Sequence, residues 1–143
     1  MARLDPATTQ KKLEKLASLE LFKTCTKEEL ALLTELTVEA DLPAGSILTY
    51  EDQVGGLLYV LLDGQADVII HGRNVVTLGP GDVIGEMALL DHRPRTAKVV
   101  AITNVRVLEI NEDDFKTLLD RAPDFVEKLR DAVATRQREP DSA

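Results

Sequence analysis

The chain has 143 residues, of which 44% are hydrophobic and 29% charged, with 8 Gly and 6 Pro. This size and composition fit one globular domain and exclude collagen-like and low-complexity chains. With 25 acidic against 17 basic residues, the formal net charge is -8, which disfavours contact with nucleic-acid phosphates and anionic membranes. Any anion that the protein binds therefore needs a local site.

The cellular compartment is indicated by the cysteine content and by the lack of a signal-like or membrane-spanning apolar run. The single cysteine, Cys25, has no partner for an internal disulfide, and residues 1–12 contain no apolar run of the kind that a secretory signal needs. The longest apolar run, Leu57–Leu62, is too short to span a bilayer. We expect a cytoplasmic protein that does not insert into membranes, with Cys25 acting as a small packed hydrophobe.

The first part of the chain has helical periodicity. Leucines recur at helical spacing between about Ala7 and Leu36, which predicts two amphipathic helices in a helical part spanning residues 1–36. The break falls at Phe22–Thr26, because Thr26 and Glu29 form the Ser/Thr-x-x-Glu pattern of a capping box.

Residues 37–110 change to a strand pattern. Val, Ile and Thr are frequent, and turn residues recur every 7 to 12 positions or so, which is typical of short antiparallel strands. The clearest strands are Leu57–Leu62, Ala66–Ile70 and Val75–Leu78, with turns at Asp63-Gly64 and at Gly72-Arg73-Asn74. A sandwich or roll is the expected product.

Helical periodicity returns in residues 111–137. Asn111 is placed to cap a helix that runs through Leu119, and Pro123 to open a second helix. That second helix carries Phe125, Leu129 and Val133 on one stripe. Residues 138–143 are polar, and we expect a frayed tail.

Catalytic and metal-binding patterns are not found. The two histidines, His71 and His92, lack the His-x-His spacing that a metal-binding β-roll needs, and both are expected on the solvated surface. No Gly-x-Ser-x-Gly nucleophile motif occurs. We therefore expect no enzyme activity, no metal and no cofactor.

The informative stretch is Gly85–Ala97, which interrupts the strand region with one predicted helical turn. Amides at the start of that turn can point at an anion, and Arg95 can grip a phosphate with its planar fork. Glu86 is suited to accept hydrogen bonds from a sugar hydroxyl. An isolated Glu86–Arg95 pair would equally well be a salt bridge that pins the loop.

This stretch resembles the phosphate-binding cassette of the cyclic nucleotide-binding domain family, residues 84–97 here. The similarity extends over roughly Leu16–Val133 and includes Leu58-Tyr59-Val60 and Leu78-Gly79-Pro80-Gly81-Asp82. It implies a mainly β fold, a jelly-roll-like eight-stranded β-roll flanked by N-terminal helices and C-terminal B and C helices, as a single domain over residues 1–143.

The resemblance also implies roles for individual residues. Arg95 matches the arginine that pairs with the cyclic phosphate, and Glu86 the carboxylate that holds the ribose 2′-hydroxyl. Thr96, beside Ala97, matches a position whose hydroxyl contacts phosphate or a syn purine. Backbone contacts are implied for Gly85, Met87 and Ala88, and an apolar wall for the base is implied for Val68, Val76 and Ile84.

The function implied is a stand-alone cyclic nucleotide-binding regulator, for cAMP or cGMP, that moves its terminal helices and acts on a separate protein effector as a monomer or weak homodimer. Phe125, Leu129 and Val133 would form a lid over the base, with Arg130 or Arg136 near the purine; alternatively that stripe only packs on the roll or dimerises. A DNA-binding regulator is disfavoured by the net charge and by where the chain ends. The other alternative is an interaction module that has lost the nucleotide or binds another small anion.

Overall fold

The computed structural model describes residues 22–54, 56–85 and 94–137. Within these ranges the chain forms two four-stranded antiparallel sheets and three helices, α2 (Lys27–Leu36), α4 (Glu112–Arg121) and α5 (Pro123–Gln137). The strands are β1 (Val38–Leu42), β2 (Ile47–Thr49), β3 (Leu58–Asp63), β4 (Ala66–Ile70), β5 (Arg73–Leu78), β6 (Val83–Ile84), β7 (Lys98–Ala101) and β8 (Val105–Ile110).

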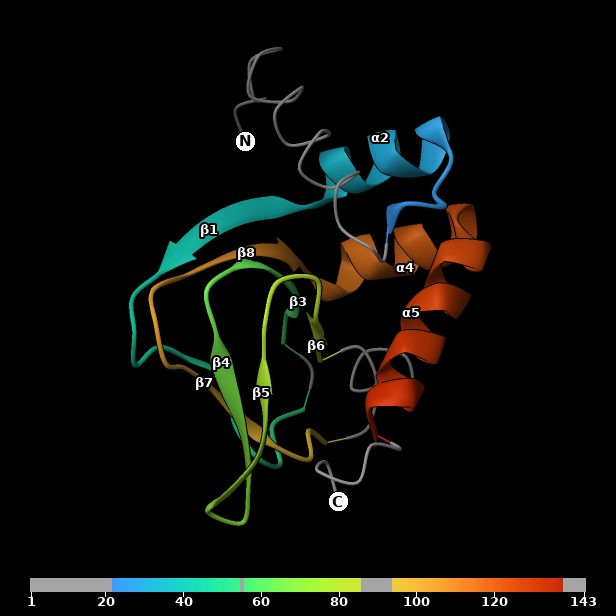
Figure 1. Cartoon of the computed structure of the whole chain (residues 1–143). Coiled ribbons are helices and arrows are strands. Elements are labelled where there is room, and N and C mark those ends of the chain that lie inside the picture. Colours follow the sequence, from blue (N-terminus) through green and yellow to red (C-terminus); the bar gives the residue numbers. More distant parts are fainter. Residues whose placement is uncertain (1–21, 55, 86–93, 138–143) are drawn as a thin grey trace.

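The two sheets form a roll. Their strand orders are β1-β8-β3-β6 and β2-β7-β4-β5, so neighbours in space are mostly distant in sequence. The helices lie together on one side of the molecule, and the β4–β5 hairpin extends away from them (Figure 1). The mainly β, eight-stranded fold expected from the sequence is confirmed.

Strand β3 explains where the core lies. Its side chains alternate between two clusters: Leu58, Val60 and Leu62 pack with the helices, whereas Tyr59 and Leu61 pack inside the roll. Because both faces are covered, the strand is buried from Leu58 to Leu62 rather than alternating, and only Asp63 at its end is exposed. The structure places it one residue later than the predicted Leu57–Leu62.

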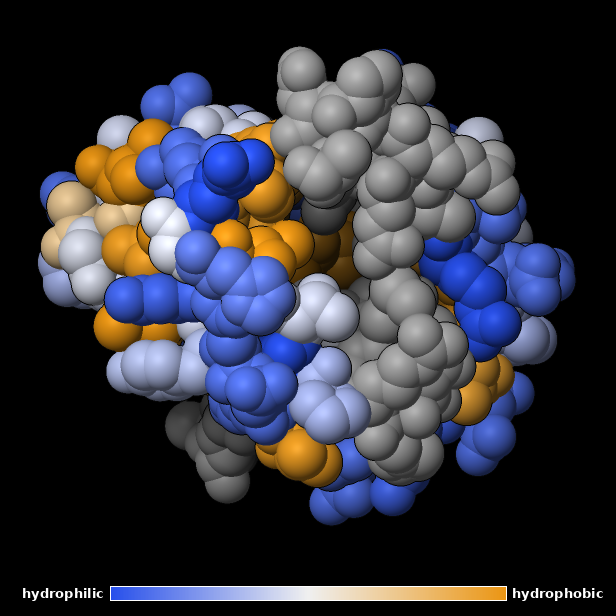
Figure 2. All heavy atoms as spheres, turned by 90° about the horizontal axis from the view of Figure 1, so that it is seen from below, coloured by the Kyte–Doolittle hydropathy of each residue, from blue (hydrophilic) through white to orange (hydrophobic). Residues whose placement is uncertain are grey.

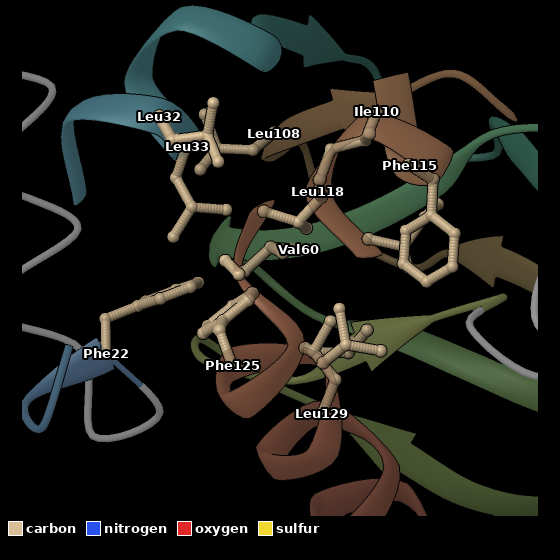
Figure 3. Packing of buried hydrophobic residues seen from close by; sticks show 14 of the residues in the cluster. Phe22, Leu32, Leu33, Val60, Leu108, Ile110, Phe115, Leu118, Phe125 and Leu129 are labelled. Atoms are coloured by element: carbon tan, nitrogen blue, oxygen red, sulfur yellow. The ribbon is translucent and has the colours of Figure 1, made fainter. Parts of the chain in front are cut away.

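The helix-side cluster joins the three helices to the first sheet. Phe22 stacks on Phe125, with ring centroids 5.3 Å apart and an interplanar angle of 17°, and both side chains are 1% exposed. Figure 3 shows these rings beside Val60 and near Leu129. Offset stacking of this kind adds about 0.5–1.5 kcal/mol to the burial of the two rings.

Helix boundaries follow the local signals. Thr26 accepts from the Glu29 amide and donates its own amide to the Glu29 carboxylate, which is the predicted capping box at the start of α2. Asn111 caps α4, which runs to Arg121 rather than Leu119, and α5 begins at Pro123 as expected. The earlier helix predicted from about Ala7 lies outside the described residues.

The turn between β4 and β5 differs from the prediction. It is formed by His71 and Gly72, which both have positive φ, 51° and 77°; two positive values in succession are the pattern of a type I′ hairpin turn. Arg73 and Asn74 belong to β5, where they pair with Ile70 and Ile69. The turn contains the predicted Gly72 but uses His71 in place of Arg73 and Asn74, because histidine, like asparagine, tolerates the left-handed region.

Candidate functional site

Arg95 is the centre of the candidate site. It lies just before β7, and its side chain is only 6% exposed, which makes it the one buried charged side chain among the residues that the structure describes. Its Nη2 donates to the carbonyl oxygen of Leu57 at 2.8 Å. Taking a charge out of water costs on the order of several kcal/mol, so a buried guanidinium such as this one depends on the groups packed around it.

Two glycines make room for the Arg95 guanidinium. A Cβ added at Gly85 would collide with Arg95 Nη1, and one added at Gly56 would lie 3.0 Å from Nη2. Both glycines have positive φ, 91° and 99°, which side-chain-bearing residues rarely adopt. Gly85 and Gly56 therefore satisfy two requirements at once, the backbone conformation and the close approach of the arginine.

The surroundings of Arg95 include two further ionisable groups. Burial lowers the pKa of the Arg95 guanidinium, while the Tyr59 phenol acts in the opposite direction. Burial also raises the pKa of Tyr59, and Glu109, its neighbour across the β3–β8 ladder, raises it further, whereas Arg95 lowers it. Burial raises the pKa of Glu109 as well. The Tyr59 phenol is thus neutral and adds no competing negative charge beside the guanidinium.

The predicted apolar wall comes from three strands. Val68 on β4 pairs directly with Val76 on β5, and both are partly buried against the cluster inside the roll that contains Ile84 of β6. The face toward which the β4–β5 hairpin points is mostly hydrophilic, with hydrophobic atoms visible in a recess (Figure 2). The three residues are brought to one cluster, and contact with a purine base stays a prediction.

The remaining predicted site residues have different placements. Thr96 is exposed and Ala97 half-buried, and the Ala97 carbonyl accepts the Thr49 hydroxyl at 2.9 Å. Glu86, Met87 and Ala88 lie outside the described residues, as does His92. The choice between an anion cradle and a Glu86–Arg95 salt bridge is therefore not made by the structure.

Sequence reasoning missed the segment on the far side of Arg95. The Arg95 amide donates to the Gln53 carbonyl, and the guanidinium donates to the Leu57 carbonyl. The guanidinium also lies directly against Gly56. These residues are about forty positions away in the chain, at or beside the glycine pair Gly55-Gly56. The one available signal was that paired glycines also allow close approach of another group.

Two residues of the stripe on α5 belong to the core. Phe125 and Leu129 are 1% and 0% exposed and belong to the helix-side cluster, so for these two the alternative of packing on the roll holds in this structure. Arg130 is exposed. The Val133 and Arg136 side chains lie outside the described ones.

Other side chains considered from the sequence do not join the site. His71 is exposed, as predicted, and its amide donates to Glu51 Oε1 at 3.2 Å. Cys25 packs against the helix-side cluster, and burial raises its pKa, with Glu29 raising it further and Lys128 lowering it, which disfavours a reactive thiolate. In the described ranges no helix is long and apolar enough to cross a membrane.

The comparisons with known proteins identify the family to which this β-roll belongs. The family model for the cyclic nucleotide-binding domain matches residues 39–122, more than half of the chain. The chain belongs to this family.

Three similar proteins illustrate the relationship. The chain is 40% identical over 88 residues to a cAMP-dependent protein kinase regulatory subunit of Aspergillus niger, covering 60% of this chain and 21% of that protein. It is 30% identical over 130 residues to a CRP-like cAMP-activated global transcriptional regulator of Mycobacterium tuberculosis, covering 87% and 58%. The crystal structure of Thermus thermophilus catabolite activator protein superposes with a TM-score of 0.73 at 31% identity, covering 85% and 59%. The chain thus spans less than two thirds of each.

Proposed function

We propose that this chain binds a cyclic nucleotide, cAMP or cGMP, reversibly, with the cyclic phosphate on Arg95. The observation that carries the proposal is the buried guanidinium of Arg95, set against Gly85 and Gly56 in an otherwise acidic protein. Membership of the family and the printed names of two relatives, one cAMP-dependent and one cAMP-activated, support the same ligand class.

In this proposal each group of predicted site residues contacts a different part of the ligand. Arg95 supplies the charge, with Thr96 and Ala97 following it at the start of the next strand. Amides of Gly85, Met87 and Ala88 donate to the phosphate, and Glu86 accepts from the ribose hydroxyl. The base lies against Val68, Val76 and Ile84.

We further propose that the domain is regulatory rather than catalytic. Binding would favour one arrangement of the terminal helices over another, and a separate protein effector would detect the difference. The relatives named above are described as a regulatory subunit and a transcriptional regulator, which supports regulation. Absence of DNA binding, a monomeric or weakly dimeric state and a cytoplasmic location stay predictions from net charge and composition.

The test is titration calorimetry and thermal unfolding with cAMP, cGMP and a cyclic dinucleotide. Ligand at a hundred times its Kd stabilises a protein by about 2.7 kcal/mol, so wild type is expected to show a clear rise in Tm with one of them. Arg95→Ala is expected to lose this rise, since hydrogen bonds to a charged group contribute about 1.5–3 kcal/mol each.

Arg106→Ala is the matched control. Arg106 is also an arginine, but it is exposed and pairs with Asp41 at 2.8 Å on the surface, so its loss should leave nucleotide binding unchanged. If wild type gives no heat with any of the three nucleotides and Arg95→Ala merely unfolds, the arginine is structural and the domain is an interaction module instead.

A further inference from the structure

The turn between β2 and β3 is built around Gln53. Within residues 50–53, which we term the bracing turn, the Gln53 amide donates to the Tyr50 carbonyl at 3.3 Å. In return, the Gln53 side-chain oxygen accepts from the Tyr50 amide at 3.1 Å. The side chain of Gln53 therefore closes its own turn.

The bracing turn holds the main chain of Arg95. The Arg95 amide donates to the Gln53 carbonyl at 2.7 Å, and the Arg95 carbonyl accepts from the Asp52 amide at 2.8 Å. Asp52 has a φ of 65°, a left-handed conformation that costs a non-glycine residue about 1–2 kcal/mol. Such a conformation persists only where its surroundings impose it, and here the closing hydrogen bonds of Gln53 do so.

The side chains of Gln53 and Arg95 both lie against Gly56. A Cβ added at Gly56 would lie 2.8 Å from Gln53 Nε2 and 3.0 Å from Arg95 Nη2, so the two groups lie against the same glycine. The next residue, Leu57, supplies the carbonyl that accepts from Arg95 Nη2. Residues 50–57 thus fix both the main chain and the side chain of Arg95.

From these contacts we infer that Gln53 is a positioning residue for Arg95: its side-chain amide closes the turn that sets where the guanidinium meets the phosphate. This inference rests on the proposed function for its effect on binding, but not for its effect on Arg95 itself. Gln53 is uncharged and lies about forty positions before Arg95 in the chain.

The test variant is Gln53→Met, which keeps the length of the side chain and removes the hydrogen-bond acceptor. Val54→Ala is the matched control, because Val54 is the next residue and is 71% exposed. In the protein without nucleotide, the Nε–H signal of Arg95 in NMR spectra is expected to be protected from solvent exchange in wild type and in Val54→Ala. It is expected to exchange faster in Gln53→Met, with little change in Tm.

With cAMP, Gln53→Met is expected to bind about fivefold more weakly, the effect of one neutral hydrogen bond, and Val54→Ala like wild type. In an Arg95→Lys background, Gln53→Met should have no further effect, because residues that act through one another are not additive. If Gln53→Met does not fold, Gln53→Asn, whose amide is one methylene too short to reach the Tyr50 amide, is expected to give the same results.

An unchanged Arg95 signal in the folded variant would overturn the inference, as would an affinity loss that simply adds to that of Arg95→Lys. If wild type does not bind cAMP but the Arg95 signal still depends on Gln53, the proposed function fails while the positioning role is retained.

Discussion

The position of the Arg95 guanidinium depends on the residues packed around it. The guanidinium is 6% exposed and needs the empty space beside two α-carbons, so the glycines at positions 85 and 56 are as much a part of the cradle as the arginine. The guanidinium donates to the Leu57 carbonyl and lies directly against Gly85, within the cassette.

Gly85→Ala tests this dependence. The added methyl group would displace Arg95 Nη1 and force alanine into a positive φ, so nucleotide affinity should fall about ten- to hundredfold, the value of a charge-assisted hydrogen bond. Titration calorimetry measures the change. Gly79→Ala is the control, because a Cβ there meets nothing within 4 Å; equal binding by Gly79→Ala and Gly85→Ala would contradict the cradle geometry.

At the residue scale, the sequence identified the residues of the cassette but not the residues from elsewhere in the chain that surround Arg95. Arg95 and Gly85 were identified from the cassette pattern, and Val68, Val76 and Ile84 do share one cluster. Gln53 and Leu57 were not identified, because a main-chain pairing between residues 53 and 95 leaves no mark in either segment's composition.

Among the elements, helix ends were the most predictable features. The capping box at Thr26, the N-cap at Asn111 and the start of α5 at Pro123 depend on residues within one turn of the chain, so local sequence is sufficient to determine these helix starts. The β4–β5 turn begins one residue and ends two residues before the predicted turn, because several residue types tolerate positive φ, and cross-strand pairing decides which of them use it.

Thr26→Ala should therefore weaken the start of α2. Two reciprocal hydrogen bonds would be reduced to one at best, and loss of an N-cap side chain costs about 1 kcal/mol of unfolding free energy. Urea denaturation measures this, with Thr26→Ser, which keeps the acceptor, as the control. Wild-type stability in Thr26→Ala would mean that the box contributes nothing to the fold.

At the scale of the whole molecule, the segment before α2 is joined to helix α5. Phe22, before α2, stacks on Phe125 at the start of α5, and Lys128 donates to the Thr24 hydroxyl at 2.6 Å. Contacts between residues about a hundred positions apart fix the helices on one side of the roll.

Phe125→Ala should be strongly destabilising. A fully buried phenylalanine costs about 3–5 kcal/mol when truncated to alanine, and here the stacked ring of Phe22 would also lose its partner. Leu119→Ala is the control, because Leu119 on α4 is 40% exposed. It should change the unfolding free energy by less than about 0.5 kcal/mol. A loss below about 1 kcal/mol for Phe125→Ala in denaturant unfolding would show that α5 is not anchored by this ring.

The position of α5 also constrains the proposed switch. Since Phe125 and Leu129 are already buried, the first half of the helix should be protected from hydrogen exchange without ligand. Nucleotide is expected to slow exchange in residues 130–137 in wild type but not in Arg95→Ala. Unchanged exchange throughout Pro123–Gln137 would exclude this helix as the element that moves.

Features within a few residues of one another could be predicted from the chain alone: helix caps, the apolar strands, and an anion-binding cassette whose glycine, arginine and threonine lie in one stretch. The tertiary structure decided the rest. It placed Gln53, Gly56 and Leu57 around Arg95, put Phe125 and Leu129 of α5 into the core, and gave β3 two buried faces. These features depend on which strands pair, and pairing between strands of a roll is determined by the packing of both sheets together rather than by any one segment.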